Sequence, residues 1–401
     1  MSKKKYTGIG QFIFGGSAYF GMKNAGLQVN DILEISDDIL TQNSYHLIKN
    51  EKDLNVIGRT EWTETDIEAK YKGKIDIMFS NAPCSGLSSV NRHASADASI
   101  NNYIVESAHT ANLLEPKVLI LENAPALISK GYPVLKEAID VMKEKYNFTA
   151  IRLTNDTHGV PMIRQRTLFV AWLKSEFDNK VPLVNAMKNP KCVVDDILVN
   201  VDSSHEGWGE YIKGHVDPAL VPFYKDVLPK KAMFESLAMN NVDIESIKES
   251  HASNYKNVKR IAQCLKEGKR YFGHGKYKMR GDSNCCSITS MVEYIHPHED
   301  RDLNIAEFKA LMGYPKDFKF YQDECKTSVV QCIAQGVAAS TVEYIVRQAI
   351  DALEGKLDMV EDCSLVYQQH TKMQRFQLTY EDLDSISDLS KVTSTWTEMK
   401  K

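Results

Sequence analysis

The sequence predicts an α/β fold in which a doubly wound, mostly parallel sheet is joined to a smaller, irregular domain. Short continuous apolar runs recur along the first half of the chain, as in strands that are buried on both faces of a parallel sheet. A segment with the apolar spacing of a helix lies between two of these runs. From about residue 174 onward this alternation stops, which indicates a change of architecture.

Three apolar runs are interpreted as parallel strands of this sheet, at residues 75–79, 118–121 and 168–172. Residues 133–146 are predicted to form a helix, because Pro133 stands where helices often begin and apolar residues follow at helical spacing. Strands that alternate with helices are typical of βαβ units, and repeated units build a doubly wound sheet.

The second half of the chain is less regular. Residues 175–280 contain Trp208 and several prolines that interrupt long elements, so we predict a second domain there. Residues 340–353 have the spacing of an amphipathic helix. The tail is polar, and we expect it to be partly disordered or to add a helix. The predicted segments are 1–174 and 287–354 for the main domain, 175–286 for the second domain and 355–401 for a polar extension.

Composition excludes several classes of protein. The 401 residues are 43% hydrophobic and 25% charged, which is ordinary for a soluble globular protein. No run of about 18 apolar residues is present, so we expect no transmembrane helix, and the apolar run behind the basic start is too short for a signal peptide. Eight scattered cysteines without a Cys-x-x-Cys pair indicate reduced thiols and no metal site. We therefore expect a cytoplasmic protein.

The strongest chemical signal lies at residues 76–88, which read Asp-Ile-Met-Phe-Ser-Asn-Ala-Pro-Cys-Ser-Gly-Leu-Ser. An apolar strand leads into a loop, and Pro83 fixes φ and ends the strand directly before Cys84. A thiol at the carboxyl edge of a sheet lies where open α/β folds place their chemistry.

Three further motifs follow in order. Leu-Glu-Asn-Ala at 121–124 comes at the end of a buried strand. Gly-Val-Pro-Met-Ile-Arg-Gln-Arg at 159–166 places Arg164 and Arg166 two residues apart, so that on a strand they share one face. The last motif runs over 301–315 and ends in Met-Gly-Tyr-Pro.

Together these four motifs resemble those of the DNA cytosine-5 methyltransferases, over roughly residues 10–175 and 280–350. The resemblance implies the Rossmann-like fold of class I S-adenosylmethionine-dependent methyltransferases, with the irregular domain as target-recognition domain. It implies transfer of a methyl group from S-adenosylmethionine to C5 of a flipped-out cytosine in duplex DNA, through a covalent Cys84 adduct. It further implies double-stranded DNA as partner and a prokaryote or a virus of one as source, and we expect a monomer. The sequence leaves open whether a restriction endonuclease is a second partner.

Four residues form the expected catalytic set. Cys84 supplies the thiolate that adds to the cytosine ring, and Glu122 donates to N3, an acid role that suits a carboxyl whose pKa is raised by burial. By the resemblance Arg166 contacts cytosine O2, and Arg164 supports the loop or a phosphate. Met162 stands where the family has a glutamine in this motif.

The motifs for the methyl donor depart most from the family pattern. The family opens with Asp-Leu-Phe-x-Gly-x-Gly-Gly, whereas residues 11–17 read Gln-Phe-Ile-Phe-Gly-Gly-Ser. Glycines here let the backbone approach the donor, and an acidic residue after the second strand fits the ribose. The residues expected to bind S-adenosylmethionine are Phe12 or Phe14 as the adenine-side aromatic, Gly15, Gly16, Glu34, Asp66 and Gln335.

A DNA surface is predicted from local charge, since the net charge of −4 does not by itself indicate a nucleic-acid partner. Residues 256–280 hold nine Lys and Arg against one Glu, with aromatic residues between them. Such a stretch favours phosphate contact, and a solvated basic surface is the alternative. The residues expected to contact DNA are Ser85, Ser88, Lys269, Arg270, Arg280 and Arg301.

Other classes fit fewer of these residues. A zinc cytidine deaminase needs His-x-Glu before Pro-Cys-x-x-Cys, and Leu87 stands where the second cysteine would be, so this class is rejected. A tRNA methyltransferase of the same fold is disfavoured because its Cys-Phe-Thr signature is missing. Two alternatives stay open: a non-catalytic DNA- or protein-binding descendant, and transfer of a different group from a modified S-adenosylmethionine.

Overall fold

The computed structural model forms two compact units. The first comprises Met1–His158, Arg164–Asn189 and Gly336–Lys401, and the second comprises Gly159–Ile163 and Pro190–Gln335. Residues 175–189 and the C-terminal tail therefore belong to the same unit as the N-terminal half. The structure describes residues 5–34, 44–58, 63–88, 91, 93–187, 192–201, 276–289, 293–299, 303–320, 326–392 and 397–398.

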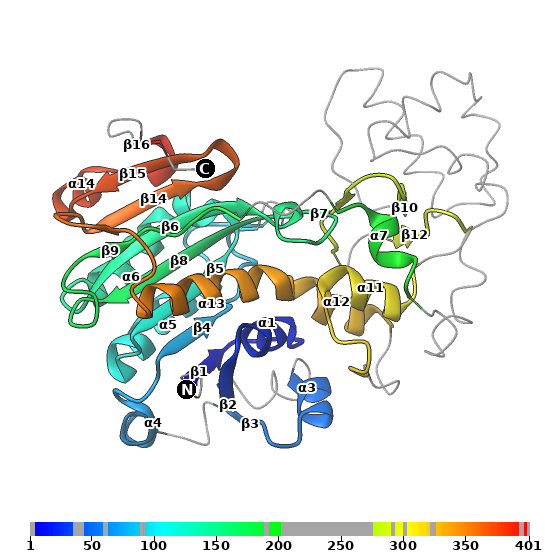
Figure 1. Cartoon of the computed structure of the whole chain (residues 1–401), viewed down its shortest axis with the longest axis horizontal. Coiled ribbons are helices and arrows are strands. Elements are labelled where there is room, and N and C mark those ends of the chain that lie inside the picture. The colour runs from blue at the N-terminus through cyan, green and yellow to red at the C-terminus, as the bar shows by residue number, and fades with distance from the viewer. Residues whose placement is uncertain are drawn as a thin grey trace. The chain divides into compact units, whose positions relative to one another are not determined.

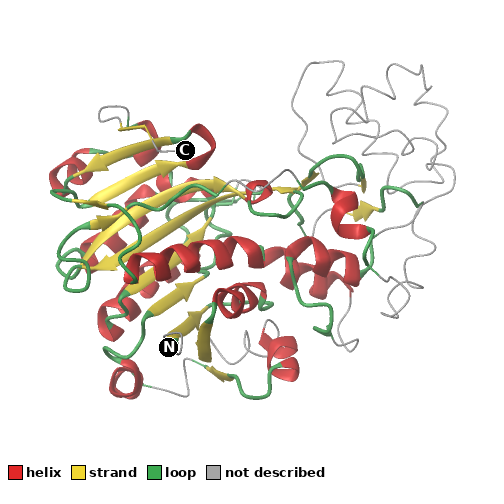
Figure 2. Cartoon of the chain, in the orientation of Figure 1, coloured by secondary structure: helices red, strands yellow, loops and turns green. Residues whose placement is uncertain are grey.

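One sheet organises the first unit, and among the described residues it has ten strands (Figures 1 and 2). In spatial order the strands are β16 (Thr397–Glu398), β15 (Gln374–Leu378), β14 (Leu365–Gln369), β6 (Tyr146–Thr154), β8 (Gln165–Leu173), β5 (Val118–Asn123), β4 (Ile77–Ser80), β1 (Tyr6–Gln11), β2 (Leu27–Leu33) and β3 (Asn55–Ile57). Strands β1 to β5 run parallel to their neighbours within this group, and β14 runs parallel to β6. The predicted doubly wound, mostly parallel sheet is confirmed.

One strand runs the other way. The sequence predicts a parallel strand at 168–172, but β8 is antiparallel to both β5 and β6, between which it lies. A strand enclosed by two neighbours and covered on both faces is buried whichever way it runs, so its apolar run carries no information on direction. The reversal has a consequence for the site, because the start of β8 lies at the same edge as the carboxyl end of β5.

Helices cover both faces of this sheet. Those of the first unit are α1 (Ser17–Ala25), α3 (Tyr45–Asn50), α4 (Glu64–Tyr71), α5 (Asn102–Leu114), α6 (Tyr132–Met142), α13 (Ala339–Leu353) and α14 (Tyr380–Ser385). Figure 1 shows α1 and α13 on one face of the sheet. Helices α5 and α6 pack against each other on the other face, and their apolar side chains form one core cluster with those of the strands. A Cβ at Gly21 would lie 2.5 Å from the Ala339 carbonyl oxygen, so glycine allows α13 to approach α1 this closely. The predicted helix at 340–353 is confirmed.

The helix predicted at 133–146 is shorter than expected. Helix α6 ends at Met142, and Tyr146 already begins β6. Tyr146 is fully buried, and its hydroxyl donates to the carbonyl of Pro116 at 2.9 Å. Burial of Tyr146 in the sheet therefore ends the helix earlier than the helical spacing of the preceding residues predicts.

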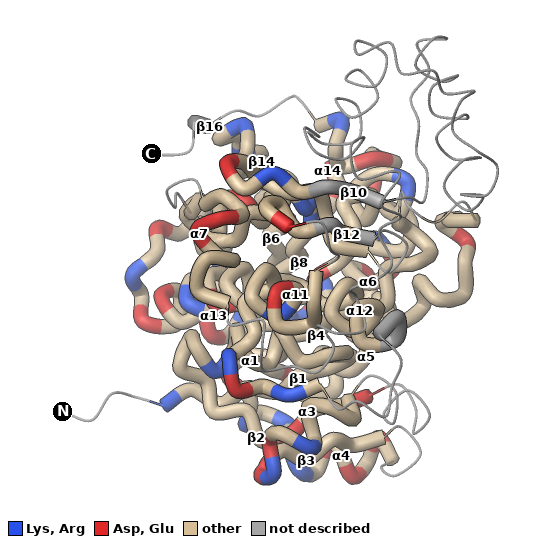
Figure 3. The backbone as a smooth tube through the Cα atoms, turned by 90° about the vertical axis from the view of Figure 1, so that its right-hand side faces the viewer, with Lys and Arg blue, Asp and Glu red and all other residues tan. Residues whose placement is uncertain are grey.

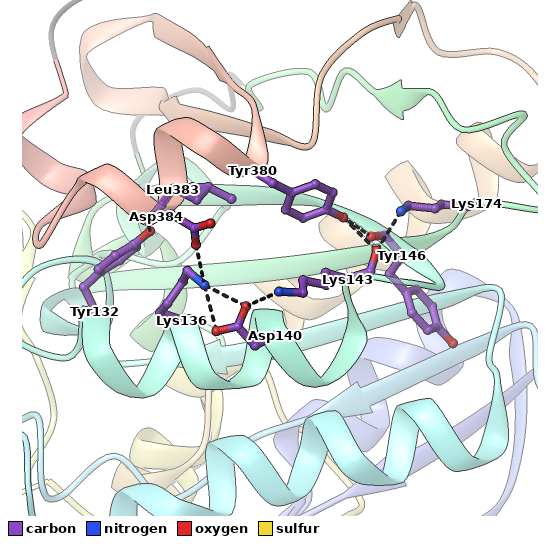
Figure 4. A network of polar contacts seen from close by, with 9 residues as sticks. All are labelled: Tyr132, Lys136, Asp140, Lys143, Tyr146, Lys174, Tyr380, Leu383 and Asp384. Carbon is purple, nitrogen blue, oxygen red and sulfur yellow. Dashed lines mark hydrogen bonds and ion pairs between the residues drawn. The ribbon is translucent and has the colours of Figure 1, made fainter.

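The tail adds strands to the sheet as well as a helix, whereas the sequence predicts a partly disordered extension or an added helix. Strand β14 continues the sheet beyond β6, and β15 pairs with β14. The added helix is present as α14, which docks on α6 and β6 (Figure 4). The Tyr132 hydroxyl donates to the Leu383 carbonyl at 2.9 Å, Lys136 pairs with Asp384 at 2.8 Å, and the Tyr380 hydroxyl lies 2.8 Å from the Tyr146 carbonyl oxygen. Leu365 and Tyr367 of β14 and Phe376 and Leu378 of β15 belong to the core cluster, so this part of the polar tail is packed into the first unit.

The other end of the sheet carries charges of both signs. Lys and Arg are interspersed with Asp and Glu over β2, β3 and α4 (Figure 3). Lys70 pairs with Asp31 at 3.1 Å, and Lys72 pairs with Glu68 at 2.7 Å. A short edge strand among mixed charges resists pairing with other chains.

The second unit has short elements in its described part. They are β7 (Met162–Ile163), α7 (Val194–Leu198), β10 (Lys276–Lys278), β11 (Cys285–Cys286), β12 (Glu293–Ile295), α11 (Ile305–Met312) and α12 (Lys326–Gln335). Helix α11 begins with a capping box between Asn304 and Glu307 and ends at Gly313, which has a φ of 76°. The Gly-Tyr-Pro ending of the last motif is therefore a helix stop.

One stretch, Val329–Leu353, is long and apolar enough to cross a membrane by length and composition, although the sequence analysis expects no such helix. Most of it is buried inside the protein, as in a core helix. It contains parts of both α12 and α13, with the break between them at 336–338.

Two histidines are buried beneath α13. The Nδ1 atom of His158 lies 3.0 Å from the Thr341 hydroxyl, and its ring stacks on Tyr344. His370 bonds the side chain of Gln368 at 3.0 Å. Burial lowers the pKa of His158 to about 4 and that of His370 to about 3.

These shifts predict acid sensitivity. Because both folded-state pKa values lie below the ordinary 6.5, the unfolded chain binds more protons once the pH falls below about 6.5. The free energy of unfolding should then fall by up to about 1.4 kcal/mol per pH unit for each histidine. Urea unfolding at pH 7.5, 6.5 and 5.5 measures this slope. His370→Gln should reduce it, and replacing the exposed His93 should not; equal slopes in all three proteins would contradict the assignment.

Candidate active site

Three strand ends meet at one edge of the sheet. Cys84 follows the carboxyl end of β4, Glu122 lies in the last part of β5, and Arg166 is near the start of the antiparallel β8. The register pairs Glu122 with Leu168 and Asn123 with Thr167, so that Arg166 lies diagonally across from Glu122 on the neighbouring strand. The Nε atom of Arg166 lies 2.6 Å from Glu122 Oε1.

Glu122 is almost fully buried, with 2% of its surface exposed. Burial raises its pKa, and the positive charges of Arg166 and Arg164 oppose that rise. A carboxyl group in these surroundings can hold a proton and donate it, whereas a solvated one is ionised near neutral pH. The direction of this shift agrees with the expectation from sequence.

Cys84 lies in a half-buried loop beside this pair. Burial raises the pKa of the Cys84 thiol, Arg166 opposes the rise, and Glu122 adds to it. The resting group is therefore a thiol, which must lose its proton when it attacks. The charges of Glu122, Arg164 and Arg166 all act on the pKa of this thiol. The structure therefore brings the four expected catalytic residues close to one another.

Arg164 reaches the same place by a different route from the one predicted. The sequence places Arg164 and Arg166 on one strand, but β8 begins at Gln165 and Arg164 lies between β7 and β8. Its carbonyl accepts a hydrogen bond from the Asn155 backbone at 3.0 Å, and its side chain is buried. The backbone bond, rather than strand pairing, fixes Arg164.

A hollow of about 1020 Å³ opens beside the carboxyl ends of β1, β2 and β3. Glu34 lines it, is buried, and accepts hydrogen bonds through Oε1 from the Ile13 backbone and the Ser44 hydroxyl, both at 3.1 Å. Gly15 and Gly16 lie between β1 and α1. Gly16 has a φ of 97°, and a Cβ there would lie 2.9 Å from a Leu47 methyl group. An acidic group and a close-approach turn thus lie at one strand edge, as a nucleoside site requires.

The remaining expected donor residues are placed less directly. Phe12 and Phe14 are both buried with left-handed backbone, and Phe12 packs edge-on against Tyr103. Asp66 is exposed and closes a capping box with Thr63 at the start of α4, so the structure gives it a helix-capping contact. Gln335 ends α12 and belongs to the second unit.

Comparison with known proteins decides the family. A sequence model of C-5 cytosine-specific DNA methylases matches residues 14–351. The chain belongs to this family. It is 21% identical over 347 residues to the Type II methyltransferase M.Eco47II of Escherichia coli, covering 80% of this chain and 73% of that one. It is also 21% identical over 280 residues to M1.HphI of Haemophilus parahaemolyticus, covering 67% and 69%.

Solved structures agree on the fold of this DNA cytosine-5 methyltransferase. The Entamoeba histolytica methyltransferase EhMeth superposes with a TM-score of 0.56 at 15% identity, over 88% of this chain and 99% of that one. The Dnmt2 methyltransferase of S. pombe gives a TM-score of 0.54 at 14% identity, over 87% and 99%. At such identities the likeness shows the fold alone.

The residues predicted to contact DNA are only partly described. Ser85 is exposed, its carbonyl accepts from the Asn91 side chain at 2.9 Å, and Ser88 is half-buried in the same loop. Arg280 makes a two-pronged pair with Asp282 at 2.7 and 2.5 Å, so a phosphate would compete with that carboxylate. Lys269, Arg270 and Arg301 lie outside the described residues.

Sequence reasoning missed several residues of this methyltransferase site. Gln11 lines the hollow and donates from Nε2 to the Thr110 hydroxyl on α5 at 3.1 Å. Asn123 donates to the Ala82 carbonyl at 3.0 Å and so ties the end of β5 to the Pro-Cys loop. Gln11 could have been found from the sequence, because it stands where the family motif begins with an aspartate. Its contact with α5 could not, since nothing in the sequence says which face of α5 meets the sheet.

The electrostatic arrangement predicts the effect of removing one guanidinium. Arg166→Met should raise the pKa of the Cys84 thiol further, because the largest charge that opposes burial is lost. Alkylation of Cys84 by iodoacetamide, followed peptide by peptide in a mass spectrometer across pH, measures this. The pH at which alkylation is half-maximal should rise in Arg166→Met. It should be unchanged in Arg347→Met, an exposed control on α13. A midpoint that is unchanged or lower in Arg166→Met contradicts the arrangement.

Proposed function

We propose that this methyltransferase moves a methyl group from S-adenosylmethionine to C5 of a flipped-out cytosine in duplex DNA, through a covalent bond to Cys84. The observation that supports this most is the group of a thiol, a buried carboxyl with raised pKa and two arginines at one sheet edge. A non-catalytic descendant has no need of a buried acid beside a cysteine, so the geometry disfavours that alternative.

The chemistry follows from these groups. Cytosine C5 is a poor nucleophile, but a sulfur that adds at C6 makes the C5 carbon electron-rich. Cys84 loses its thiol proton to water as Sγ bonds to C6, and Glu122 donates a hydrogen bond or proton to N3, where the electrons accumulate. Arg166 holds the O2 side of the ring. After methylation the C5 proton leaves to a base or water, the Sγ–C6 bond breaks, and the ring regains its double bond.

The residues of the hollow fit S-adenosylmethionine. Glu34 would accept hydrogen bonds from the ribose hydroxyls, and the turn at Gly15 and Gly16 would let the backbone approach the methionine part. When bound, the sulfonium would supply the methyl group by breaking its S–CH3 bond, and S-adenosylhomocysteine would leave as the thioether product. Transfer of a different group remains the alternative, since the donor motifs of this chain differ from the family pattern.

DNA must come to the thiol with its target base exposed. A cytosine inside a duplex cannot reach Cys84, so flipping is part of the proposal, at a cost of a few kcal/mol. The second unit would read the sequence and the stretch at 256–280 would contact phosphates, mostly outside the described residues. A restriction endonuclease partner, a monomeric state and a cytoplasmic location in a prokaryote complete this proposal.

Trapping tests the covalent step. DNA that carries 5-fluorocytosine at the target should form a stable adduct with the wild-type protein, because fluorine cannot leave C5 as a proton does. Cys84→Ser should form no adduct and transfer no methyl groups, since a hydroxyl is far less nucleophilic at neutral pH. Gel shift under denaturing conditions and intact mass spectrometry measure the adduct. Methyl transfer that survives in Cys84→Ser would sink the proposal.

Donor binding tests the hollow. S-adenosylhomocysteine should raise the melting temperature of the wild type, because a ligand that binds only the folded state stabilises it. Glu34→Ala should weaken that increase, since Glu34 lines the hollow. Glu51→Ala is a control: it removes hydrogen bonds to Tyr19 and Lys23 on α1. The proposal about Glu34 fails when both variants respond to the ligand as the wild type does.

A further inference from the structure

The loop that carries Cys84 is held at its base by one buried side chain outside the family motifs. Asn101 precedes α5 and has none of its surface exposed. Its Nδ2 atom donates to the carbonyl oxygens of Ser95 at 3.0 Å and Ala96 at 2.7 Å. Because both partners are acceptors, the orientation of the amide is fixed by the bonds themselves.

The same side chain lies against the residue two positions after Cys84. A Cβ built at Gly86 would lie 2.2 Å from Asn101 Oδ1, and its three nearest atoms all belong to the Asn101 side chain. Gly86 is thus packed directly on the amide. One side chain therefore touches both Gly86 and Ser95–Ala96, and it closes the loop between them.

Asn101 does not have the local role that its position suggests. An asparagine that precedes a helix usually caps it by accepting from a backbone N–H in the first turn. Here the side chain makes no capping bond. Its two donors go to loop carbonyls, and among the described residues the buried Oδ1 atom has no hydrogen-bond partner. Burying such an acceptor is costly, so the side chain is kept here by the contacts it makes with the loop.

Other contacts fix the loop on either side of Cys84. The Leu87 backbone donates to the Cys84 carbonyl at 3.0 Å, and the Leu87 side chain is fully buried against Gly131, where a Cβ would lie 2.7 Å from Leu87 Cδ1. On the other side, Asn123 bonds the Ala82 carbonyl. The loop that holds the thiol is therefore anchored before and after Cys84, and Asn101 is the outer anchor.

We propose that Asn101 is a positioning residue for the reaction: through Gly86 it sets the position of the Cys84 thiol for attack on the cytosine ring. This inference rests on the proposed covalent mechanism. A reacting atom displaced by about 1 Å costs roughly 100-fold in rate. Loss of Asn101 should therefore slow bond formation without weakening the binding of DNA or donor.

The test compares rates of trapping on 5-fluorocytosine DNA at saturating DNA and S-adenosylmethionine. Asn101→Ala should trap about 10- to 100-fold more slowly than the wild type, with an unchanged Kd for DNA and for S-adenosylhomocysteine. Asn101→Asp keeps the volume but loses both donors, so it should be at least as slow. The matched control is Asn147→Ala at the start of β6, which removes a hydrogen bond of 2.6 Å from the Asn147 side-chain amide to the Asn179 carbonyl. It should lower the melting temperature without slowing trapping.

A double variant tests the contact itself. Gly86→Ala should slow trapping, because its methyl group meets the Asn101 amide. Adding Asn101→Ala removes the three atoms nearest to that methyl group. The fold-decrease in trapping rate of the double variant should therefore be smaller than the product of the fold-decreases of the two single variants. The inference is overturned when Asn101→Ala and Asn101→Asp trap at the wild-type rate, or when Asn147→Ala slows trapping equally. Failure of the wild type to trap would instead overturn the proposed function.

Discussion

The site depends on the ion pair between Arg166 and Glu122, because that pair lets a carboxyl group lie buried at the end of a parallel strand. An isolated ionised carboxylate would be too costly in this place. Its neighbour can be an arginine only because β8 enters the sheet antiparallel and begins where β5 ends. One reversed strand thus supplies the charge that balances both the acid and the thiol.

The loop that carries the thiol is fixed both by its own Leu87 and by side chains from outside it that donate hydrogen bonds to backbone carbonyls. Asn123 reaches it from the end of β5, and Asn101 reaches it from the start of α5. Gly86 leaves the space in which the Asn101 amide lies, and Gly131 leaves the space for the Leu87 side chain. The position of Cys84 is therefore determined by elements that flank the sheet edge, which is how a reactive group is held without a strained backbone.

The tail extends this architecture beyond the region that the family shares. The family match ends at residue 351, whereas β14, β15 and α14 follow it and continue the sheet past β6. These elements cover what would otherwise be an exposed edge and bury apolar side chains against α6. The extension is integral to the first unit, and buried polar groups such as His370 come with it.

The sequence by itself determined which side chains form the candidate site, because motifs of a few residues name their groups directly. The motifs alone predicted Cys84 behind a proline, Glu122 after an apolar run and Arg166 in a pair of arginines. The buried strands and the final long helix were also predicted from the sequence. Only the tertiary structure decided the direction of β8, the strands of the tail, and the contacts of Asn101 and Gln11. Apolar runs record burial but not direction, and hydrogen bonds between distant residues leave no periodic trace in the chain.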